Sequence, residues 1–475
     1  MITFLICLAI LIGGYFLYCR YIYSQSGIDE NELTPAVAMK DGIDYVAMPW
    51  YKVLLIQFLN IAGTGPIFGA ILGACFGPIA FLWITLGTVF AGAVHDFLSG
   101  VISMKHKGTS VSEIFGIYLG DTMKKIMRVF SVILLILVGT VFVTSPAGLL
   151  SNMTGINSNI LVGVIIVYYI LATILPVDKI IGKIYPVFGI CLIIMALGLF
   201  VSMFIKHFNG TAPMVELTKE TFSMNLHPDG LKASPFVFVT IACGALSGFH
   251  ATQSPMMARC VKNYKETKAV FCGAMVLEGI VALIWCAVTI AFFRTPEGIS
   301  EALANNNGAA GVAGILSKEL LGTIGAVLAV LGIVACPITS GDTAFRSSRL
   351  IIADAFKIDQ KSILKRFVVA IPLFIICILL TTINFDIIWR YFAWSNQTLA
   401  AIFLWTGGIY LCQNKKNYLI AILPATLMSY VCVSYIMQAK EGFKLGADIS
   451  NITGIIVAIA LFIFFMVKRD SMRNK

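Results

Sequence analysis

Ionisable side chains are rare inside the apolar stretches of this 475-residue sequence, and the few found there are the first candidates for chemistry. An ionisable group in hydrocarbon is costly, so it usually serves a function such as proton transfer. We predict proton binding, and thereby coupling to a proton gradient, by four of them: His95, Asp96, Glu278 and Asp342. For Glu278 a structural hydrogen bond between helices is an equally good interpretation.

Two of these residues should lie at similar depth in a membrane. His95 and Glu278 each stand about nine or ten residues from the inner end of their apolar runs, which is roughly 13 to 15 Å of helix. A shared proton-binding cluster is therefore expected. Asp342 and Arg346 are four residues apart, and an ordinary helical ion pair is the simpler interpretation of that spacing.

Two Gly/Pro clusters predict interrupted helices. Residues 62–66 read Ala-Gly-Thr-Gly-Pro, and residues 244–255 run from Gly to Pro through Ser-Gly-Phe-His. In lipid a helix is interrupted only where the freed backbone groups face protein, water, an ion or a substrate. In each cluster Gly can end one half-helix and Pro can open the next, with Gly65 or Ser254 as the cap. The bare amides would suit a carboxylate, although a simple kink explains one such cluster taken alone.

These clusters supply most of the predicted binding residues. His250 would bond a substrate carboxylate or carry a proton, and a histidine satisfied by a backbone carbonyl is the alternative. Asn396 and Gln397 would orient substrate or form an outer gate, beside aromatics that suit an interfacial belt. The candidates for substrate binding are Gly63, Thr64, Gly65, Pro66, Gly248, His250, Gln253, Ser254, Asn396 and Gln397. A candidate sodium site of hard oxygen ligands comprises Ala62, Gly63, Thr339 and Ser340.

The elements that position these residues are membrane helices. Hydrophobic residues make up 59% of the chain and charged residues 12%, with a mean hydropathy of +0.90, which excludes an ordinary soluble protein. The net charge of +10 does not indicate nucleic-acid binding, because the basic residues lie in loops between apolar runs. The 12 cysteines include no CxxC pair and predict neither disulfides nor a zinc site. The expected partners are therefore the lipid bilayer and a small-molecule substrate, and the sequence leaves the oligomeric state open.

The sequence predicts an all-α polytopic protein of about 13 transmembrane helices. A span needs roughly 20 apolar residues, and the runs cover residues 2–19, 53–76, 77–104, 129–150, 160–177, 184–205, 233–258, 269–293, 320–341, 367–385, 391–412, 418–438 and 449–467. Thirteen spans place 26 of the 34 Lys and Arg residues on one side. Cytoplasmic loops are rich in these residues, which predicts an outer N-terminus and a cytoplasmic C-terminus.

The spacing of the two clusters predicts the architecture. They lie five spans apart, so their helices cross the bilayer in opposite directions, as in a five-plus-five inverted repeat of the LeuT/APC type. The expected core is residues 51–412, with repeats at 51–206 and 233–412. Residues 1–50 and 413–475 would add one and two peripheral helices.

Several stretches resemble the carbon starvation protein A family of bacterial inner-membrane transporters. They are GPIFGAILGACFGPIAFLW from Gly65, GAVHDFLSGVISMKHKGTSVSEI from Gly92, IACGALSGFHATQSP from Ile241, TSGDTAFRSSR from Thr339 and FAWSNQTLA from Phe392. The resemblance implies uptake of short peptides or pyruvate, proton coupling in pyruvate-type members, and a five-plus-five fold in the bacterial cytoplasmic membrane.

The predicted function is a secondary active transporter that imports a small carboxylate-bearing nutrient with a proton by alternating access. A sodium-coupled amino-acid or peptide symporter of the same fold is the alternative, and a passive channel is a weaker one. An enzyme is not expected, because the sequence has no H-E-x-x-H and no G-x-S-x-G motif. No cofactor is expected beyond the coupling ion, H⁺ or, as the alternative, Na⁺.

Overall fold

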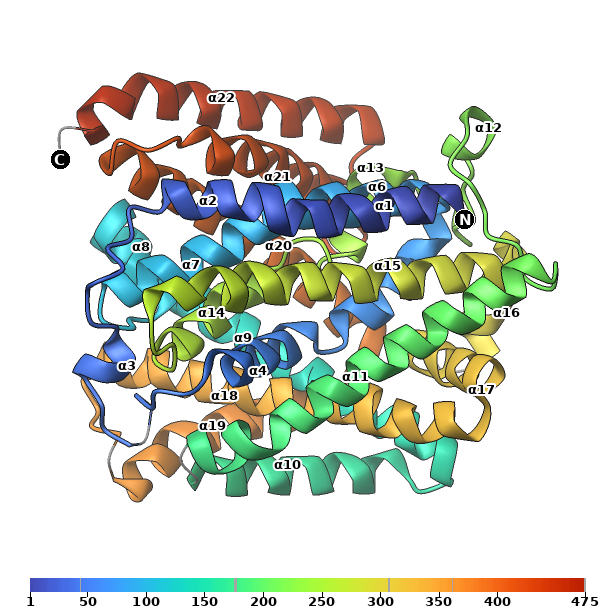
Figure 1. Ribbon diagram of the computed structural model, residues 1–475, viewed down its shortest axis with the longest axis horizontal. Helices are drawn as coiled ribbons and strands as arrows, with labels where there is room; N and C mark the ends of the chain where they lie inside the picture. Colours follow the sequence, from blue (N-terminus) through green and yellow to red (C-terminus); the bar gives the residue numbers. More distant parts are fainter. Residues whose placement is uncertain (43, 175–176, 306–307, 361, 474–475) are drawn as a thin grey trace.

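Helices account for the regular structure of the chain in the computed structural model, which describes residues 1–42, 44–174, 177–305, 308–360 and 362–473. Most helices lie along the long axis of the molecule, and the two termini lie at opposite ends of it (Figure 1). The end of the predicted run 160–177, and Lys361 and Lys475 of the basic loops, fall outside the described residues.

The first half of the chain holds the helices that were expected for the first span and the first repeat. They are α1 (Ile2–Gly13), η1 (Gly14–Tyr18), α2 (Cys19–Gln25), α3 (Pro35–Ala38), α4 (Trp50–Ala62), η2 (Gly65–Gly69), α5 (Ala70–Gly73), η3 (Ala74–Phe76), α6 (Ile79–Gly87), η4 (Thr88–Gly92), α7 (Ala93–Lys105), α8 (Val111–Leu119), α9 (Asp121–Thr154), α10 (Ser158–Ile174) and α11 (Val177–Phe208).

The second half holds the second repeat and two further long helices. They are α12 (Lys219–Phe222), α13 (Ala233–Thr240), α14 (Gly248–Ala258), η5 (Tyr264–Glu266), η6 (Lys268–Gly273), α15 (Ala274–Phe293), α16 (Pro296–Asn305), α17 (Ala309–Leu328), η7 (Ala329–Val334), α18 (Ala335–Phe356), α19 (Ile363–Leu380), α20 (Phe385–Gln413), α21 (Leu419–Gln438) and α22 (Ala447–Arg473).

The predicted apolar runs fall on these helices, although fewer of them qualify individually as spans. Among the described residues, nine helices are long and apolar enough to cross a membrane, or ten with the bent pair that includes α4. The segment Ser158–Thr173 is apolar but shorter, and the run at 233–258 is split between α13 and α14. The total of thirteen crossings therefore stays a prediction, as does the orientation.

The first predicted interruption is confirmed. Helix α4 ends at Ala62, Gly63 leaves helical geometry, and the chain resumes at Gly65 after a bend of 52°. Pro66 stands in the first turn of the new segment, as expected. The residue at the cap position is Thr64, however, so the prediction of Gly65 as cap was wrong by one residue.

The second interruption exists but lies earlier than predicted. Helix α13 ends at Thr240, residues 241–247 are not helical, and α14 begins at Gly248 with Ser247 at its cap position. Ser254 and Pro255 lie inside α14, so the prediction that Ser254 caps a half-helix was wrong. Pro255 lacks the N–H that would bond the carbonyl of Ala251, so α14 loses one intrahelical hydrogen bond there.

The two interruptions touch each other. A Cβ atom placed on Gly65 would lie 1.9 Å from the Cβ atom of Cys243, so the two backbones are closer than any side chain at position 65 would permit. On the other side of the contact, Gly244 has a φ of +93° and packs against Pro66. Glycine adopts such a φ without steric cost. Both interruptions therefore meet in the middle of the molecule.

The helices around the interruptions form two groups by their contacts. The first group consists of α4, α7, α14 and α15 with their adjoining short segments, and the second consists of α9, α10, α18 and α19. The groups meet where α18 packs against α4 and where α9 and α18 approach α14. In Figure 1, α10 and α19 lie along the lower edge, α18 runs at about the height of α4, and α21 and α22 lie toward the upper edge.

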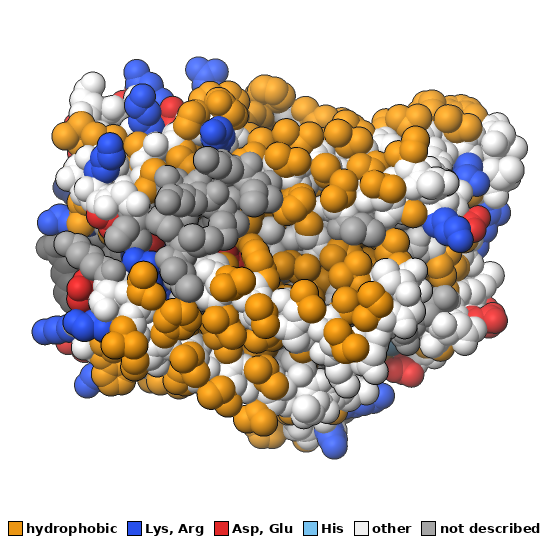
Figure 2. All heavy atoms as spheres, turned by 90° about the horizontal axis from the view of Figure 1, so that it is seen from below, with side chains coloured by type: hydrophobic (Ala, Val, Ile, Leu, Met, Phe, Trp, Pro, Cys, Tyr) orange, Lys and Arg blue, Asp and Glu red, His pale blue; other side chains and the backbone are white. Residues whose placement is uncertain are grey.

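The outer surface is apolar over its middle. Figure 2 shows a face on which hydrophobic side chains cover the central part and Lys and Arg side chains lie toward the ends. Large exposed hydrophobic residues occur along α10, α11 and α19, among them Ile160, Val164, Val167, Val187, Ile190, Ile194, Leu364, Val368, Ile371 and Ile375. Exposed apolar side chains of this kind suit contact with lipid.

Helix α8 packs against α9 and is joined to it by ion pairs. Ser110 stands at its cap position and makes no side-chain cap bond in the described structure. Glu113 instead forms ion pairs with Lys124 (2.5 Å) and Arg128 of α9. These two cations lower the pKa of Glu113 in spite of its partial burial.

We expect Gly65→Ala to destabilise the protein, because the added methyl group would overlap the side chain of Cys243. Overpacking of this kind costs about 1–3 kcal/mol. Thermal unfolding of the purified protein in detergent measures it. Gly163→Ala is the matched control, since no described atom lies within 4 Å of the Cβ it adds. An unchanged melting temperature for Gly65→Ala would contradict the contact between the two interruptions.

Candidate functional site

Four buried ionisable side chains form a continuous line beside the interruptions. The Nδ1 atoms of His95 and His250 lie 2.8 and 2.9 Å from the two carboxylate oxygens of Asp96, one on each. The Nε2 atom of His250 lies 3.5 Å from Oε2 of Glu278. All four side chains are fully buried. We call His95, Asp96, His250 and Glu278 the ionisable line.

The ionisable line confirms that His95 and Glu278 lie in one cluster, but they do not meet directly. Asp96 and His250 stand between them, a connection that runs from α7 through α14 to α15. No spacing in the sequence pairs residue 96 with residue 250, because the contact exists only once the two helices pack. Asp342 lies outside the ionisable line, where its carboxylate accepts a hydrogen bond of 2.8 Å from Tyr185.

Short π-helical turns precede both carboxylates. The segment η4 comes immediately before α7, which carries Asp96, and η6 comes immediately before α15, which carries Glu278. An extra residue in a turn rotates everything that follows it, and such turns are frequent at functional sites. The two turns occupy corresponding spans of the two proposed repeats.

The freed backbone of the second interruption is satisfied by side chains from three other helices. The indole of Trp83 donates to the carbonyl of Ile241 (3.2 Å), and the hydroxyl of Thr88 donates to the carbonyl of Gly244 (3.0 Å). The amide of Gln397 donates to the carbonyls of both Phe238 (2.9 Å) and Leu246 (3.1 Å). Gln397 thus joins α13 to the non-helical segment that follows it.

Asn396 forms hydrogen bonds with the residues at the start of α14. Its Oδ1 accepts the backbone N–H of Phe249 (2.6 Å) and the hydroxyl of Ser247 (3.1 Å). Its Nδ2 donates to the Ser247 hydroxyl and lies 3.6 Å from the sulfur of Cys243. The side chains of Asn396 and Gln397, expected to contact substrate, are thus engaged with the protein itself in this structure.

Two of the candidate sodium residues, Thr339 and Ser340, lie on α18 where it packs against α4. The hydroxyl of Ser340 donates to the carbonyls of Leu59 (3.0 Å) and Cys336 (2.9 Å), and Thr339 donates to the same Cys336 carbonyl. The structure therefore brings α18 against the end of α4, as expected. The contact falls on Leu59, one turn before the predicted ligands Ala62 and Gly63.

Several polar groups beside the interruptions have no hydrogen-bond partner among the described residues. They include both side-chain atoms of Asn60, the hydroxyl of Thr64 and the Oε1 atom of Gln253. The side-chain amide N–H of Gln57 donates to the hydroxyl of Ser254 (3.2 Å), and the side-chain oxygen of Gln57 has no hydrogen-bond partner among the described residues. Buried polar groups rarely stay unpaired, so these atoms suit bound water or a polar solute. Sequence analysis missed Gln57 and Asn60, which read as two polar residues in an apolar run.

Cavities at the two ends of the molecule differ greatly in size. A cavity of about 820 Å³ opens beside the end of α9 and reaches Phe68 of η2 and Trp389 of α20. At the other end, a cavity between Thr252, Arg259 and Ser347 has about 20 Å³. The larger of these two cavities thus lies at the end that the basic residues predict to be external.

Aromatic rings separate the larger cavity from the ionisable line. Trp389 packs against Phe392, Phe392 approaches Phe142, and Phe142 lies edge-on to Phe249 at 5.8 Å between ring centroids. Phe249 directly precedes His250 in the chain. These rings come from α9, α14 and α20 and lie between the larger cavity and the ionisable line.

Comparison with known proteins identifies the family. A family model described as carbon starvation protein CstA matches residues 1–154 and 144–301. The chain belongs to the carbon starvation protein CstA family. This confirms the resemblance of the motifs around His95 and His250.

Relatives in this CstA family include transporters. An uncharacterized membrane protein of Haemophilus influenzae is 41% identical and aligns with 64% of this chain and 94% of its own length. The peptide transporter CstA of Bacillus subtilis is 26% identical, with 86% and 85% aligned. The pyruvate/proton symporter BtsT of Escherichia coli is 25% identical over 57% of this chain, which spans less than half (46%) of that relative.

Solved structures confirm the fold class of this CstA family member. A mutant of the manganese transporter of Eremococcus coleocola aligns with a TM-score of 0.56 at 14% identity, covering 91% of this chain and 99% of the other. MhsT in complex with L-phenylalanine aligns with a TM-score of 0.57 at 13% identity, covering 88% and 98%. At these identities the likeness concerns the fold alone, which is the five-plus-five LeuT type.

We expect Asn396→Ala to lower stability, because it leaves the N–H of Phe249 and the hydroxyl of Ser247 without their partner. An unsatisfied buried donor costs about 1–3 kcal/mol. Thr398→Ala on the same helix is the control, since its hydroxyl bonds the Trp394 carbonyl of its own helix. Melting temperatures in detergent compare the two. Equal values would show that Asn396 does not hold the start of α14.

Proposed function

We propose that this protein imports a small carboxylate-bearing carbon nutrient, a short peptide or pyruvate, together with a proton by alternating access. Membership of a family whose named relatives are transporters supports the general function. The ionisable line supports proton coupling, and it is the observation on which the finer proposal rests.

The ionisable line suits a proton because each neighbouring pair can share one. Asp96 accepts from both imidazoles, and His250 faces a carboxylate with each of its nitrogens. An imidazole between two carboxylates can take a proton from one side and release it to the other. Burial keeps water from exchanging that proton freely, so its release must await a change of conformation.

The substrate carboxylate would lie where the two interruptions meet. Helix α14 begins there, and the positive end of its dipole favours a negative charge, while the N–H of Phe249 is itself bonded to Asn396. The unpaired groups of Asn60, Thr64 and Gln253 supply further polar contacts beside it. Since Ser254 lies inside α14, the anion-facing amides belong to the turn that starts at Gly248.

Alternating access would be a relative movement of the two helix groups. All members of the ionisable line belong to the first group, while the bond from Ser340 to Leu59 crosses to the second. A conformation with the large cavity at one end and the small cavity at the other would be one of the two end states of that cycle. Coupling requires that proton and substrate bind the two states unequally.

Sodium coupling is the second candidate, and the contact between α18 and α4 favours it. The hydroxyl of Ser340 bonds the carbonyl of Leu59 and that of Thr339 bonds the carbonyl of Cys336, and such hard oxygen ligands suit Na⁺. A channel would need rings of charge or of carbonyls around a pore. The ionisable line is buried within one helix group and does not form such a ring, which disfavours a channel.

Uptake into proteoliposomes tests the function. With labelled pyruvate and labelled dipeptides, we expect accumulation of one solute class against its gradient when an inward proton gradient is imposed. A sodium gradient without a proton gradient should give no accumulation. Accumulation driven by sodium alone would replace the proton by Na⁺, and equilibration under every gradient would refute coupled transport.

Neutral variants of the ionisable line test its role. Glu278→Gln and Asp96→Asn should abolish accumulation and leave exchange of preloaded substrate largely intact, because exchange needs no net proton movement. The exposed Asp448 supplies the control Asp448→Asn, which should accumulate substrate like the unmodified protein. Unchanged uphill uptake in both line variants would remove them from the coupling mechanism.

A further inference from the structure

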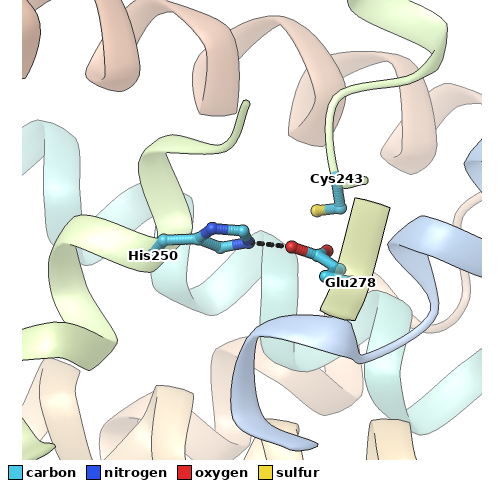
Figure 3. A group of neighbouring side chains, drawn as sticks. All are labelled: Cys243, His250 and Glu278. Atoms are coloured by element: carbon cyan, nitrogen blue, oxygen red, sulfur yellow. Dashed lines mark ion pairs between the residues drawn. The ribbon is translucent and has the colours of Figure 1, made fainter. Parts of the chain in front are cut away.

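Three potential metal ligands converge at the meeting point of the interruptions. The thiol of Cys243, the imidazole of His250 and the carboxylate of Glu278 each offer one ligand atom, and the three atoms lie within 4.8 Å of one another (Figure 3). All three residues are buried. We propose that Cys243, His250 and Glu278 bind a borderline divalent transition-metal ion of the Zn²⁺ type.

The donor set selects the class of metal. Sulfur, imidazole nitrogen and carboxylate oxygen are the ligands of Zn²⁺, whereas Mg²⁺ and Ca²⁺ require oxygen ligands. Bond lengths of Zn²⁺ to nitrogen and oxygen place those two atoms about 3.3 Å apart in a tetrahedral site. The Nε2 atom of His250 and Oε2 of Glu278 are already 3.5 Å apart.

Asp96 orients the histidine for this role. Its carboxylate oxygen lies 2.9 Å from Nδ1 of His250, so Nδ1 carries the hydrogen and the lone pair of Nε2 faces Glu278. A carboxylate behind a ligating histidine fixes the ring and raises its basicity. His95 holds the other oxygen of Asp96 and keeps the carboxylate in place.

The ligand atoms of His250 and Glu278 lack hydrogen-bond partners among the described residues. The Nε2 atom of His250 and both oxygens of Glu278 have no hydrogen bond within the described part of the chain. Leaving such groups buried and unpaired is costly, and one metal ion would satisfy them together. The thiol of Cys243 donates to the hydroxyl of Ser247 (3.4 Å) and accepts the amide of Asn396 at 3.6 Å, and the Asn396 donor would stabilise the thiolate that forms when a metal binds.

The thiol must approach a metal held by the other two ligands to the Zn–S bond length of about 2.3 Å. Cys243 lies in the non-helical residues 241–247, so this movement breaks no helical hydrogen bonds. The thiol proton is released when the metal binds. Three protein ligands leave a fourth position open for water.

The same atoms carry the coupling proton in the proposed function, and the expected effect on transport rests on that proposal. A metal on Nε2 of His250 and on Glu278 occupies the positions between which a proton would pass. Metal and coupling proton would therefore be alternative occupants, and Zn²⁺ should inhibit proton-driven uptake.

Cobalt chloride added to the purified, detergent-solubilised protein tests binding directly. Co²⁺ bound to a thiolate gives a near-ultraviolet charge-transfer band, and tetrahedral Co²⁺ gives intense visible bands. We expect both bands to saturate at one Co²⁺ per chain and to disappear when zinc chloride is added. Cys243→Ser should lose the charge-transfer band, and Asp96→Asn should weaken binding about 10- to 100-fold.

Cys286→Ser is the matched control, because Cys286 is a buried cysteine of α15 that lies outside the ligand set. It should keep the bands. Thermal unfolding checks that the variants are folded. Zinc chloride should raise the melting temperature of the unmodified protein and of Cys286→Ser, and it should leave the melting temperature of Cys243→Ser unchanged. Absence of bands in the unmodified protein, or their retention in Cys243→Ser, would overturn the metal site.

Uptake in proteoliposomes separates this inference from the proposed function. Inhibition by zinc chloride that is lost in Cys243→Ser supports both. Saturable Co²⁺ binding with no effect of zinc on proton-driven uptake supports the metal site and counts against the role of His250 and Glu278 in coupling. Failure of Co²⁺ to bind overturns the metal site whatever the transport result.

Discussion

The centre of this protein depends on one constraint, which is that backbone groups freed inside a membrane must be bonded by the protein itself. The interruption at residues 241–247 frees several carbonyls and amides, and side chains from distant parts of the chain receive them. Trp83, Thr88, Asn396 and Gln397 bind the carbonyls of Ile241, Gly244 and Leu246 and the amide of Phe249. Without these bonds a continuous helix would be the more stable form.

That constraint also explains the position of the ionisable line. Because 241–247 is not helical, α14 starts at mid-depth and sets His250 in its first turn, where the imidazole reaches Asp96 on one side and Glu278 on the other. The glycines at 65 and 244 let the two interruptions touch. The polar centre is therefore a consequence of the interrupted backbone, and both belong to one structural unit.

The sequence was sufficient for the parts of this arrangement that depend on local composition. Apolar runs predicted the helices, and the Gly-Thr-Gly-Pro stretch predicted the first interruption almost to the residue. The second interruption was placed too late, because Pro255 looked like the start of a half-helix, whereas Ser247 and Gly248 begin it. The bond between Asp96 and His250, and the approach of Cys243 to them, depend on the packing of separate helices, which no local pattern encodes.

Charge neutrality links the two proposals for the centre. Two carboxylates and two imidazoles are buried together, and an uncompensated charge there would be expensive. A substrate carboxylate arriving at the start of α14 adds one negative charge, which one proton on the ionisable line neutralises. A divalent metal would add two positive charges, which loss of the Cys243 thiol proton and of the proton shared by His250 and Glu278 would offset. Under the two proposals, neutrality would therefore link an anionic substrate to proton uptake by the ionisable line and a metal ion to proton release from it.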